Sequence, residues 1–282
     1  MSSPFQPTPP PPVERRARTR FDTMKIWDEA SAALLANREV LLAVLGVFAV
    51  LPLFALKMFL PLPEPLSGEQ PAQLLERWGF YFDANWLSFV AVLAVELFGM
   101  LVTLALLGDS RRPTVGEAIR GAARGAPSFM VALIGGAALA FLSGLVPVTV
   151  IGLSGSLALT QVAAVIGTVV ILYMLVRFAF IGPAVLLGGD RNPVYALRTS
   201  YFATKGIGWQ LLVFNLLIYL AFGIVGWLIK AAVVIVTTLI AGAEGGTLAG
   251  NLIDSLAQAA LAATFVAVIV ASYRQVGGIA RS

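Results

Sequence analysis

The acidic residue Glu96 lies in the middle of a long apolar stretch, where an ionised side chain is costly. A carboxylate in such a stretch faces the interior of a helix bundle and is paired or protonated. It can serve as an ion or proton site, or as a ligand for a substrate cation, with Asn215 as a second polar group in the same midplane site. The alternative is a single hydrogen-bonded contact between helices, and the sequence leaves both open.

Three basic residues, Arg120, Arg198 and Lys205, lie in short segments between apolar runs. Long basic side chains bury their stems while their charges reach phosphates, and each cation beside an anionic leaflet contributes about 1 kcal/mol. These residues predict binding of membrane lipids, anionic in character, or of a partner protein at the cytoplasmic face. The alternative is that they only set the orientation of the chain in the membrane.

The residue types that the sequence lacks exclude several classes of function. The chain has no cysteine and no histidine, which excludes disulfides, thiolate metal sites, cysteine nucleophiles and histidine-based acid–base catalysis. No nucleotide-binding, metal-binding or hydrolase motif is visible, so we expect no metal, no cofactor and no enzyme activity. The least favoured alternative is a lipid-modifying enzyme that uses the acids of segment 61–85, which lack the spacing of metal ligands.

The composition predicts that lipid is the main solvent of the chain. Of 282 residues, 59% are apolar and 12% are charged, against about 25% charged residues in a typical soluble domain. A membrane-spanning helix needs about 20 apolar residues. We therefore predict an all-α, polytopic membrane protein with six transmembrane helices at residues 40–60, 86–107, 129–150, 157–180, 207–229 and 252–273. Residues 231–241 extend the fifth run, either as a helix extension or as a shallow re-entrant piece.

The basic residues predict the orientation of these helices. They concentrate before the first run, after the second, after the fourth and at the C-terminal end, whereas the alternate loops are acidic or uncharged. Because basic loops stay on the cytoplasmic side, we expect both termini to be cytoplasmic. This orientation also accounts for the net charge of +4, so we expect no nucleic-acid partner. Arg177 and Lys230 lie near the ends of their spans, where long side chains can reach the membrane surface.

The segments outside the spans have their own predicted structures. We predict that residues 1–20 form a disordered, proline-rich and basic cytoplasmic tail, ahead of a transmembrane domain at 21–282. The loop at 61–85 predicts a short helix at 71–78 on the outer surface. Amphipathic helices are predicted on the cytoplasmic surface at residues 21–38, 114–126 and 193–205.

The ends of these surface helices carry capping residues. Asp22 and Asn192 suit the N-caps of the first and the third surface helix. Pro193 suits the first helical position, where its missing N–H group has no consequence. Gly206 suits the C-terminal end of the third helix.

An ungapped alignment of residues 115–127 with residues 193–205 predicts an internal repeat. It matches Arg120 to Arg198 and small residues to small residues. Residues 27–39 fit the same register, so we predict three units, each a surface helix followed by two membrane helices. The alternative, that any amphipathic loop helix would give a similar pattern, stays open.

The segment 182–209 resembles a known family. It contains the sequences Pro-Ala-Val-Leu-Leu at 183–187, Ala-Leu-Arg-Thr-Ser-Tyr at 196–201 and Thr-Lys-Gly-Ile-Gly-Trp at 204–209. This pattern is similar to that of the YciC-like inner-membrane proteins and of the membrane domain found beside glycerophosphoryl diester phosphodiesterases. With the six-span layout, the likeness covers residues 21–274. It implies no phosphodiesterase activity, because that catalytic module needs histidines and a soluble barrel.

The resemblance implies a six-span protein of the bacterial inner membrane and offers no catalytic residues to carry over. Together with the residues above, it leads us to expect a non-enzymatic membrane protein whose cytoplasmic surface helices bind anionic lipid or a partner protein. The alternative function is a transporter or channel component with a midplane site at Glu96.

Overall fold

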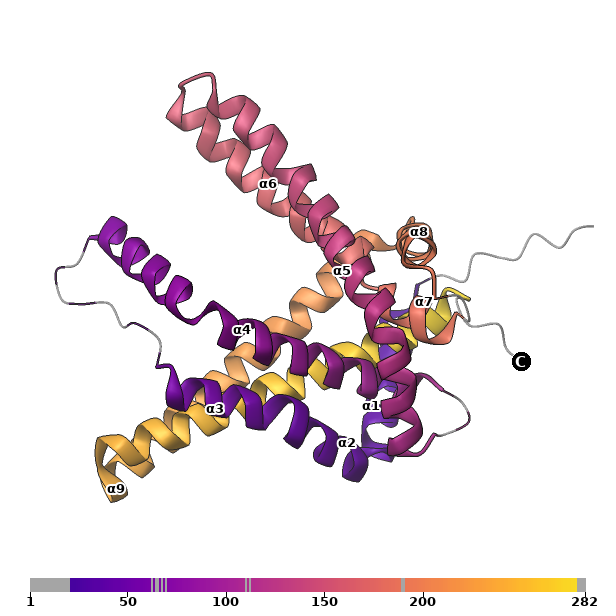
Figure 1. The fold of residues 1–282 in the computed structure, drawn as a ribbon, viewed down its shortest axis with the longest axis horizontal. Helices are drawn as coiled ribbons and strands as arrows, with labels where there is room; N and C mark the ends of the chain where they lie inside the picture. The colour runs from indigo at the N-terminus through magenta and orange to yellow at the C-terminus, as the bar shows by residue number, and fades with distance from the viewer. Residues whose placement is uncertain are drawn as a thin grey trace, which may run out of the picture.

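The computed structural model describes residues 21–61, 63, 66, 68, 70–109, 111, 113–188 and 191–277. Every regular element in these ranges is a helix, which confirms the predicted all-α fold class (Figure 1). The predicted proline-rich tail at residues 1–20 lies outside the described ranges, as do residues 278–282 of the predicted transmembrane domain.

The helices follow one another in the order of the predicted segments, although some of those segments merge. The described elements are α1 (Thr23–Ala36), α2 (Arg38–Leu45), the π-helix η1 (Gly46–Val50), α3 (Leu51–Phe59), α4 (Pro71–Gly108), α5 (Val115–Gly152), α6 (Leu157–Arg177), α7 (Ile181–Leu187), α8 (Pro193–Ala203) and α9 (Gly208–Gln275). Within the described part of the chain, five helical stretches are long and apolar enough to cross a membrane. These stretches identify the chain as a membrane protein.

The predicted helix caps are present in the structure. The Asp22 side chain accepts hydrogen bonds from the amides of Met24 and Lys25 at the start of α1. The Asn192 side chain accepts a hydrogen bond from the amide of Val194 at the start of α8. Gly206, after α8, has a φ of 91°, a conformation that glycine adopts at little cost.

The longest helix, α9, is a helical hairpin with Gly242 at its tip. Gly242 has a φ of 74° and a ψ of −176°, which lies outside the helical region. Residues on either side of this tip contact each other, since Lys230 Nζ donates a hydrogen bond to Asp254 Oδ2 at 2.7 Å. Residues 231–241 continue the first arm as a helix, which decides between the two alternatives that the sequence left open.

Three predicted boundaries are absent from the structure. α4 is continuous from Pro71, so the expected short helix at 71–78 and the expected span at 86–107 are one element. α5 joins the expected surface helix at 114–126 to the span at 129–150, with Pro127 inside the helix. The expected loop before residue 252 is helical except at Gly242. α5 runs through Pro127 without a break, since membrane helices tolerate an internal proline.

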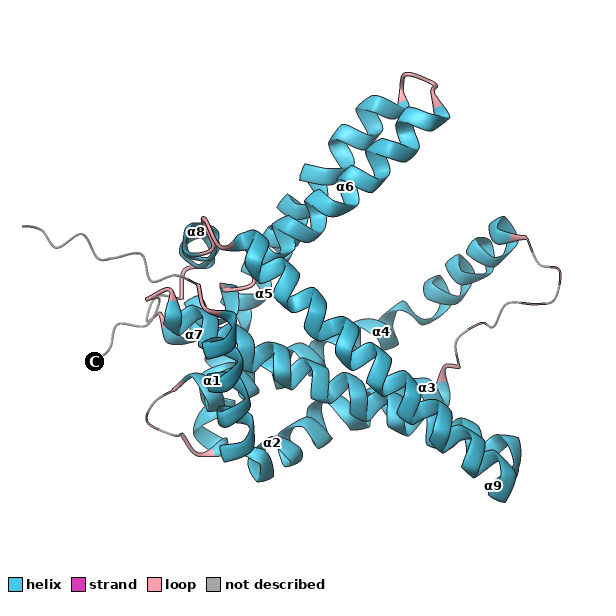
Figure 2. Cartoon of the chain, turned by 180° about the vertical axis from the view of Figure 1, so that it is seen from behind, coloured by secondary structure: helices cyan, strands magenta, loops and turns pink. Residues whose placement is uncertain are grey.

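The long helices form three hairpins within the described residues: α2–η1–α3 with α4, α5 with α6, and the two arms of α9. Figure 1 shows these hairpins spreading from the end of the molecule where α1, α7 and α8 gather, and the view from behind shows the same arrangement (Figure 2). The tips of the hairpins point away from that end. The short helices are therefore segregated from the tips.

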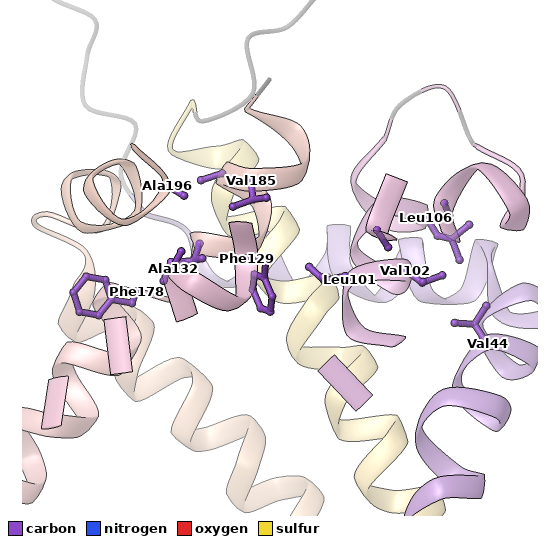
Figure 3. Packing of buried hydrophobic residues seen from close by; sticks show 13 residues of the cluster. Val44, Leu101, Val102, Leu106, Phe129, Ala132, Phe178, Val185 and Ala196 are labelled. Carbon is purple, nitrogen blue, oxygen red and sulfur yellow. The ribbon is translucent and has the colours of Figure 1, made fainter. Parts of the chain in front are cut away.

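A buried core holds the hairpins together where they meet. Leu101 of α4, Phe129 of α5 and Val185 of α7 belong to one cluster, and each is at most 2% exposed (Figure 3). A second cluster packs Ile26 and Ala30 of α1 against the second arm of α9. The first and last parts of the described chain are joined in this way.

α5 and α6 approach each other so closely that two glycines face one another. A Cβ atom placed on Gly144 would lie 2.5 Å from the carbonyl oxygen of Gly167, and one placed on Gly167 would lie 2.8 Å from that of Gly144. Small residues permit such an approach in membranes, where van der Waals contact stabilises helix pairs.

We predict that Gly167→Ala lowers the free energy of unfolding by about 1–3 kcal/mol, because the added methyl group forces the two helix backbones apart. The measurement is unfolding of the purified protein in mixed micelles titrated with sodium dodecyl sulfate and followed by circular dichroism. Gly152→Ala is the control in the same hairpin, since its Cβ would meet no atom closer than 3.9 Å. Equal stability of the two variants would contradict the close approach.

Candidate functional site

A cavity of about 720 Å³ lies between the first hairpin and α9. Its walls come from α2–η1–α3, from α4 and from both arms of α9, and most of its lining side chains are apolar. The charged residues among them are Glu96, Lys230 and Asp254. The volume falls within the range of about 300–1,000 Å³ that is typical of small-molecule sites.

Two lysines share the carboxylate of Asp254, and of the two only Lys230 lines the cavity. Asp254 Oδ2 accepts a hydrogen bond from Lys230 Nζ at 2.7 Å and lies 3.5 Å from Lys57 Nζ. Lys57 Nζ is buried and makes no hydrogen bond to any described residue. Its side chain is 18% exposed, against 37% for Lys230, so Lys57 is the better shielded of the two cations. Two positive charges therefore have one carboxylate in contact with them.

Glu96 lines the same cavity from α4. Its Oε1 atom is buried and has no hydrogen-bond partner in the part of the chain that the structure describes. A buried polar atom without a partner is unfavourable in an apolar environment. Glu96 thus places a carboxyl group at the cavity wall with no hydrogen bond to that oxygen from a described residue.

Asn215 does not line the cavity, although the sequence predicted it as the second polar group of a midplane site. Its Nδ2 atom donates a hydrogen bond at 2.8 Å to the carbonyl of Leu211, one turn earlier in the same helix. The structure therefore does not bring Asn215 to the cavity that Glu96 lines, and the Asn215 amide donates within α9. The cavity brings Glu96 together with Lys230 and Asp254 in its place.

Sequence reasoning missed Lys57. The available signal was that Lys57 is the only charged residue within the predicted span at 40–60. A lone cation near the end of a span ordinarily reaches the membrane surface, and nothing in the sequence pairs it with Asp254 of α9.

A second and more polar pocket, of about 570 Å³, lies between the end of α4, the beginning of α5 and α7. Four arginines and two acids line it: Arg111, Arg120, Arg124, Arg191, Asp109 and Glu117. A capping box fixes the beginning of α5, since the amide of Thr114 donates to Glu117 Oε2 at 2.8 Å and the amide of Glu117 donates to Thr114 Oγ1 at 3.4 Å. This cap positions Arg120 and Arg124, one turn apart, along one wall.

The other two predicted cations lie outside this pocket. Arg198 is exposed on α8, and its guanidinium carbon lies 5.7 Å from the centre of the Phe202 ring. Lys205 is exposed beyond the end of α8. Neither residue lines the pocket that contains Arg120, so the three predicted lipid contacts do not form a single site.

The polar residues of α8 hold the break between α6 and α7. The carbonyl of Arg177 accepts hydrogen bonds from Ser200 Oγ at 3.0 Å and from Thr204 Oγ1 at 3.1 Å. The amide of Phe180 donates to Ser200 Oγ at 3.0 Å. Side chains therefore satisfy backbone groups that the interrupted helix leaves open, which gives this conspicuous polar segment a structural role.

Arg177 is buried, whereas the sequence predicted a cation that reaches the membrane surface. It is 5% exposed, and its guanidinium carbon lies 4.1 Å from the centre of the Tyr201 ring. A cation over an aromatic face is stabilised without water, so the ring replaces the expected contact with the surface.

Comparison with protein-family models, curated proteins and solved structures found no match for this chain. The resemblance to the YciC-like inner-membrane proteins therefore stays a prediction. Among the described residues, no group of three or more histidine, cysteine, aspartate or glutamate side chains could hold a metal ion.

Proposed function

We propose that this membrane protein crosses the bacterial inner membrane six times, with both termini in the cytoplasm, and that it binds anionic lipid headgroups at its cytoplasmic face. The proposed activity is binding rather than catalysis. The observation that carries it is the clustering of Arg111, Arg120, Arg124 and Arg191 around one pocket.

The contacts between the two ends of the described chain support the proposed topology. The amide of Asp22 donates to Gln275 Oε1 at 3.2 Å, and Gln275 Nε2 donates to the carbonyl of Asp22 at 3.4 Å. Because these residues flank the first and the last helix, the two ends lie on the same side of the protein. Counting α9 as two crossings makes the total even, as this requires.

We predict that single cysteines report this topology directly, because the chain has none of its own. Glu76→Cys and Glu244→Cys, near the tips of two hairpins, should react with a membrane-impermeant maleimide added to intact spheroplasts. Lys205→Cys should react only after the membrane is permeabilised. All three positions are exposed, so burial would not explain a negative result. Labelling of Lys205→Cys from outside would overturn the proposed orientation.

The proposed threefold repeat is supported by one aligned position. Ala30, Ala118 and Ala196 occupy the same place in the three aligned segments, and they are 1%, 2% and 0% exposed. At each of these positions, the helix face that carries small side chains packs against the rest of the protein. The cations at 120 and 198, two residues further along, are exposed, as a contact with a leaflet surface requires.

Arginine is well suited to the proposed ligand. Its guanidinium group matches the oxygens of a phosphate with two parallel hydrogen bonds and stays charged at all physiological pH values. Four such groups against two acids leave the pocket positive. Arg198 and Lys205 are proposed to make shallower contacts with headgroups beside α8.

We predict that the double variant Arg120→Gln/Arg124→Gln binds phosphatidylglycerol about thirtyfold more weakly, since each cation contributes about 1 kcal/mol. Native mass spectrometry of the detergent-purified protein at increasing lipid concentration measures the bound fraction. Lys25→Gln/Arg38→Gln is the matched control, because it removes the same charge from exposed positions outside the pocket. A control variant that loses as much affinity as the pocket variant would contradict a specific site.

A second candidate function, transport or conduction through the membrane part, is favoured by the cavity at Glu96. A carboxyl group with one buried oxygen that has no hydrogen-bond partner among the described residues, at the wall of a cavity within the spans, is the arrangement expected of an ion or proton pathway. Substrate sites in repeat-built carriers lie near the midplane, and Glu96 lies near the middle of its predicted span.

We predict that, if this candidate holds, the protein in liposomes dissipates an imposed pH gradient and Glu96→Gln reduces the flux to that of empty liposomes. A pH-sensitive dye trapped inside the liposomes measures the flux. Asn215→Ala should leave it unchanged, because Asn215 lies outside the cavity. Flux that survives Glu96→Gln would remove Glu96 from this role.

A further inference from the structure

The cavity between the first hairpin and α9 has Lys230 and Glu96 at different places on its wall. Lys57 and Lys230 gather around Asp254, while Glu96 reaches the cavity from α4. Among the described residues, both lysines form their salt bridges with Asp254 and neither forms one with Glu96. The cavity thus offers hydrogen-bond donors and a hydrogen-bond acceptor at different places on its wall.

Lys230 keeps unused capacity for an anion. An ammonium group has three donors, and Lys230 uses one of them on Asp254. Lys230 lines the cavity, and its side chain is 37% exposed. An anionic group at this place would accept the remaining donors.

Glu96 keeps unused capacity for a cation. Its Oε1 atom is buried and unpartnered among the residues that the structure describes. A primary ammonium group would offer both a positive charge and N–H donors, and charge-assisted hydrogen bonds are the stronger kind. A quaternary ammonium group has no N–H to donate and would leave this oxygen unsatisfied.

The rest of the wall is apolar. The lining includes Leu45 and Phe48 of the first hairpin, Leu93 of α4, and Phe222 and Trp227 of α9. Trp227 is 67% exposed and Leu93 is 52% exposed, so the cavity has an apolar border that opens toward the surface of the helices. In a membrane this surface meets hydrocarbon chains.

We propose that this cavity binds a single phospholipid whose headgroup carries both a primary ammonium and a phosphate. The ammonium contacts Glu96, the phosphate contacts Lys230, and the acyl chains follow the apolar wall toward the bilayer. An anionic lipid without an amine would satisfy Lys230 and leave Glu96 unpaired. The proposal requires neither the basic pocket beside α7 nor transport.

The test is lipid selectivity of the full chain in detergent, measured by native mass spectrometry with phosphatidylethanolamine, phosphatidylcholine and phosphatidylglycerol of identical acyl chains. All measurements use a protein with Arg120→Gln and Arg124→Gln, so that lipid bound at the basic pocket does not contribute to the signal. In this background, phosphatidylethanolamine should bind about tenfold more tightly than either of the others. This protein has an unaltered cavity, so equal binding of phosphatidylethanolamine and phosphatidylcholine to it would overturn the proposal.

Substitutions at the wall then separate the two contacts. Glu96→Gln should abolish the preference for phosphatidylethanolamine over phosphatidylcholine, and Lys230→Gln should weaken binding of both. Glu244→Gln, at the exposed tip of α9, is the matched control for the loss of one acid. Circular dichroism and gel filtration identify variants that fail to fold. A folded Glu96→Gln protein that keeps the preference would overturn the assignment of the ammonium to Glu96.

Discussion

The main constraint on this fold is that backbone groups at helix ends need hydrogen-bond partners, because the hydrocarbon of a membrane contains no water to supply them. Helix C-terminal carbonyls are satisfied here by side chains from other segments. Tyr81 Oη donates to the carbonyl of Leu60 at 2.7 Å, just beyond α3. Arg274 Nη2 donates to the carbonyl of Gly108 at 2.9 Å, at the end of α4. Ser200 of α8 and Thr204, just beyond it, do the same for the end of α6. Each of these bonds also joins elements far apart in the sequence, so satisfying the helix ends fixes the positions of the hairpins.

The sequence predicted what depends on local chemistry. Apolar length identified the membrane stretches, and the caps at Asp22 and Asn192 followed from residue type and position. It failed where the outcome depends on partners. The surface helix expected at 114–126 and the span expected at 129–150 are one helix that runs through Pro127, because membrane helices tolerate an internal proline. Arg177 is buried because Tyr201 of α8 covers it, which no periodicity along α6 could indicate.

The candidate site divides in the same way. Glu96 was identifiable from its apolar surroundings alone, because an acid there requires an explanation. Its companions were not, since Asp254 meets Lys57 and Lys230 only after α9 folds back at Gly242 and packs beside the first hairpin. Asn215 carried a similar sequence signal but hydrogen-bonds within its own helix. A polar residue in a span is therefore weak evidence for a shared site, because its side chain can hydrogen-bond to the backbone of its own helix instead.

The three described hairpins differ in what they carry, and this difference bears on how the protein works. The first hairpin and α9 hold the intramembrane acids and lysines and enclose the cavity. The hairpin of α5 and α6 has no charged residue between Arg124 and Arg177, and its glycines let the two backbones meet. Close backbone packing favours a rigid pair, whereas a cavity leaves its walls free to adjust. The α5–α6 hairpin is thus suited to a fixed support beside α7 and the arginine pocket, and any movement that accompanies ligand binding is expected between the other two.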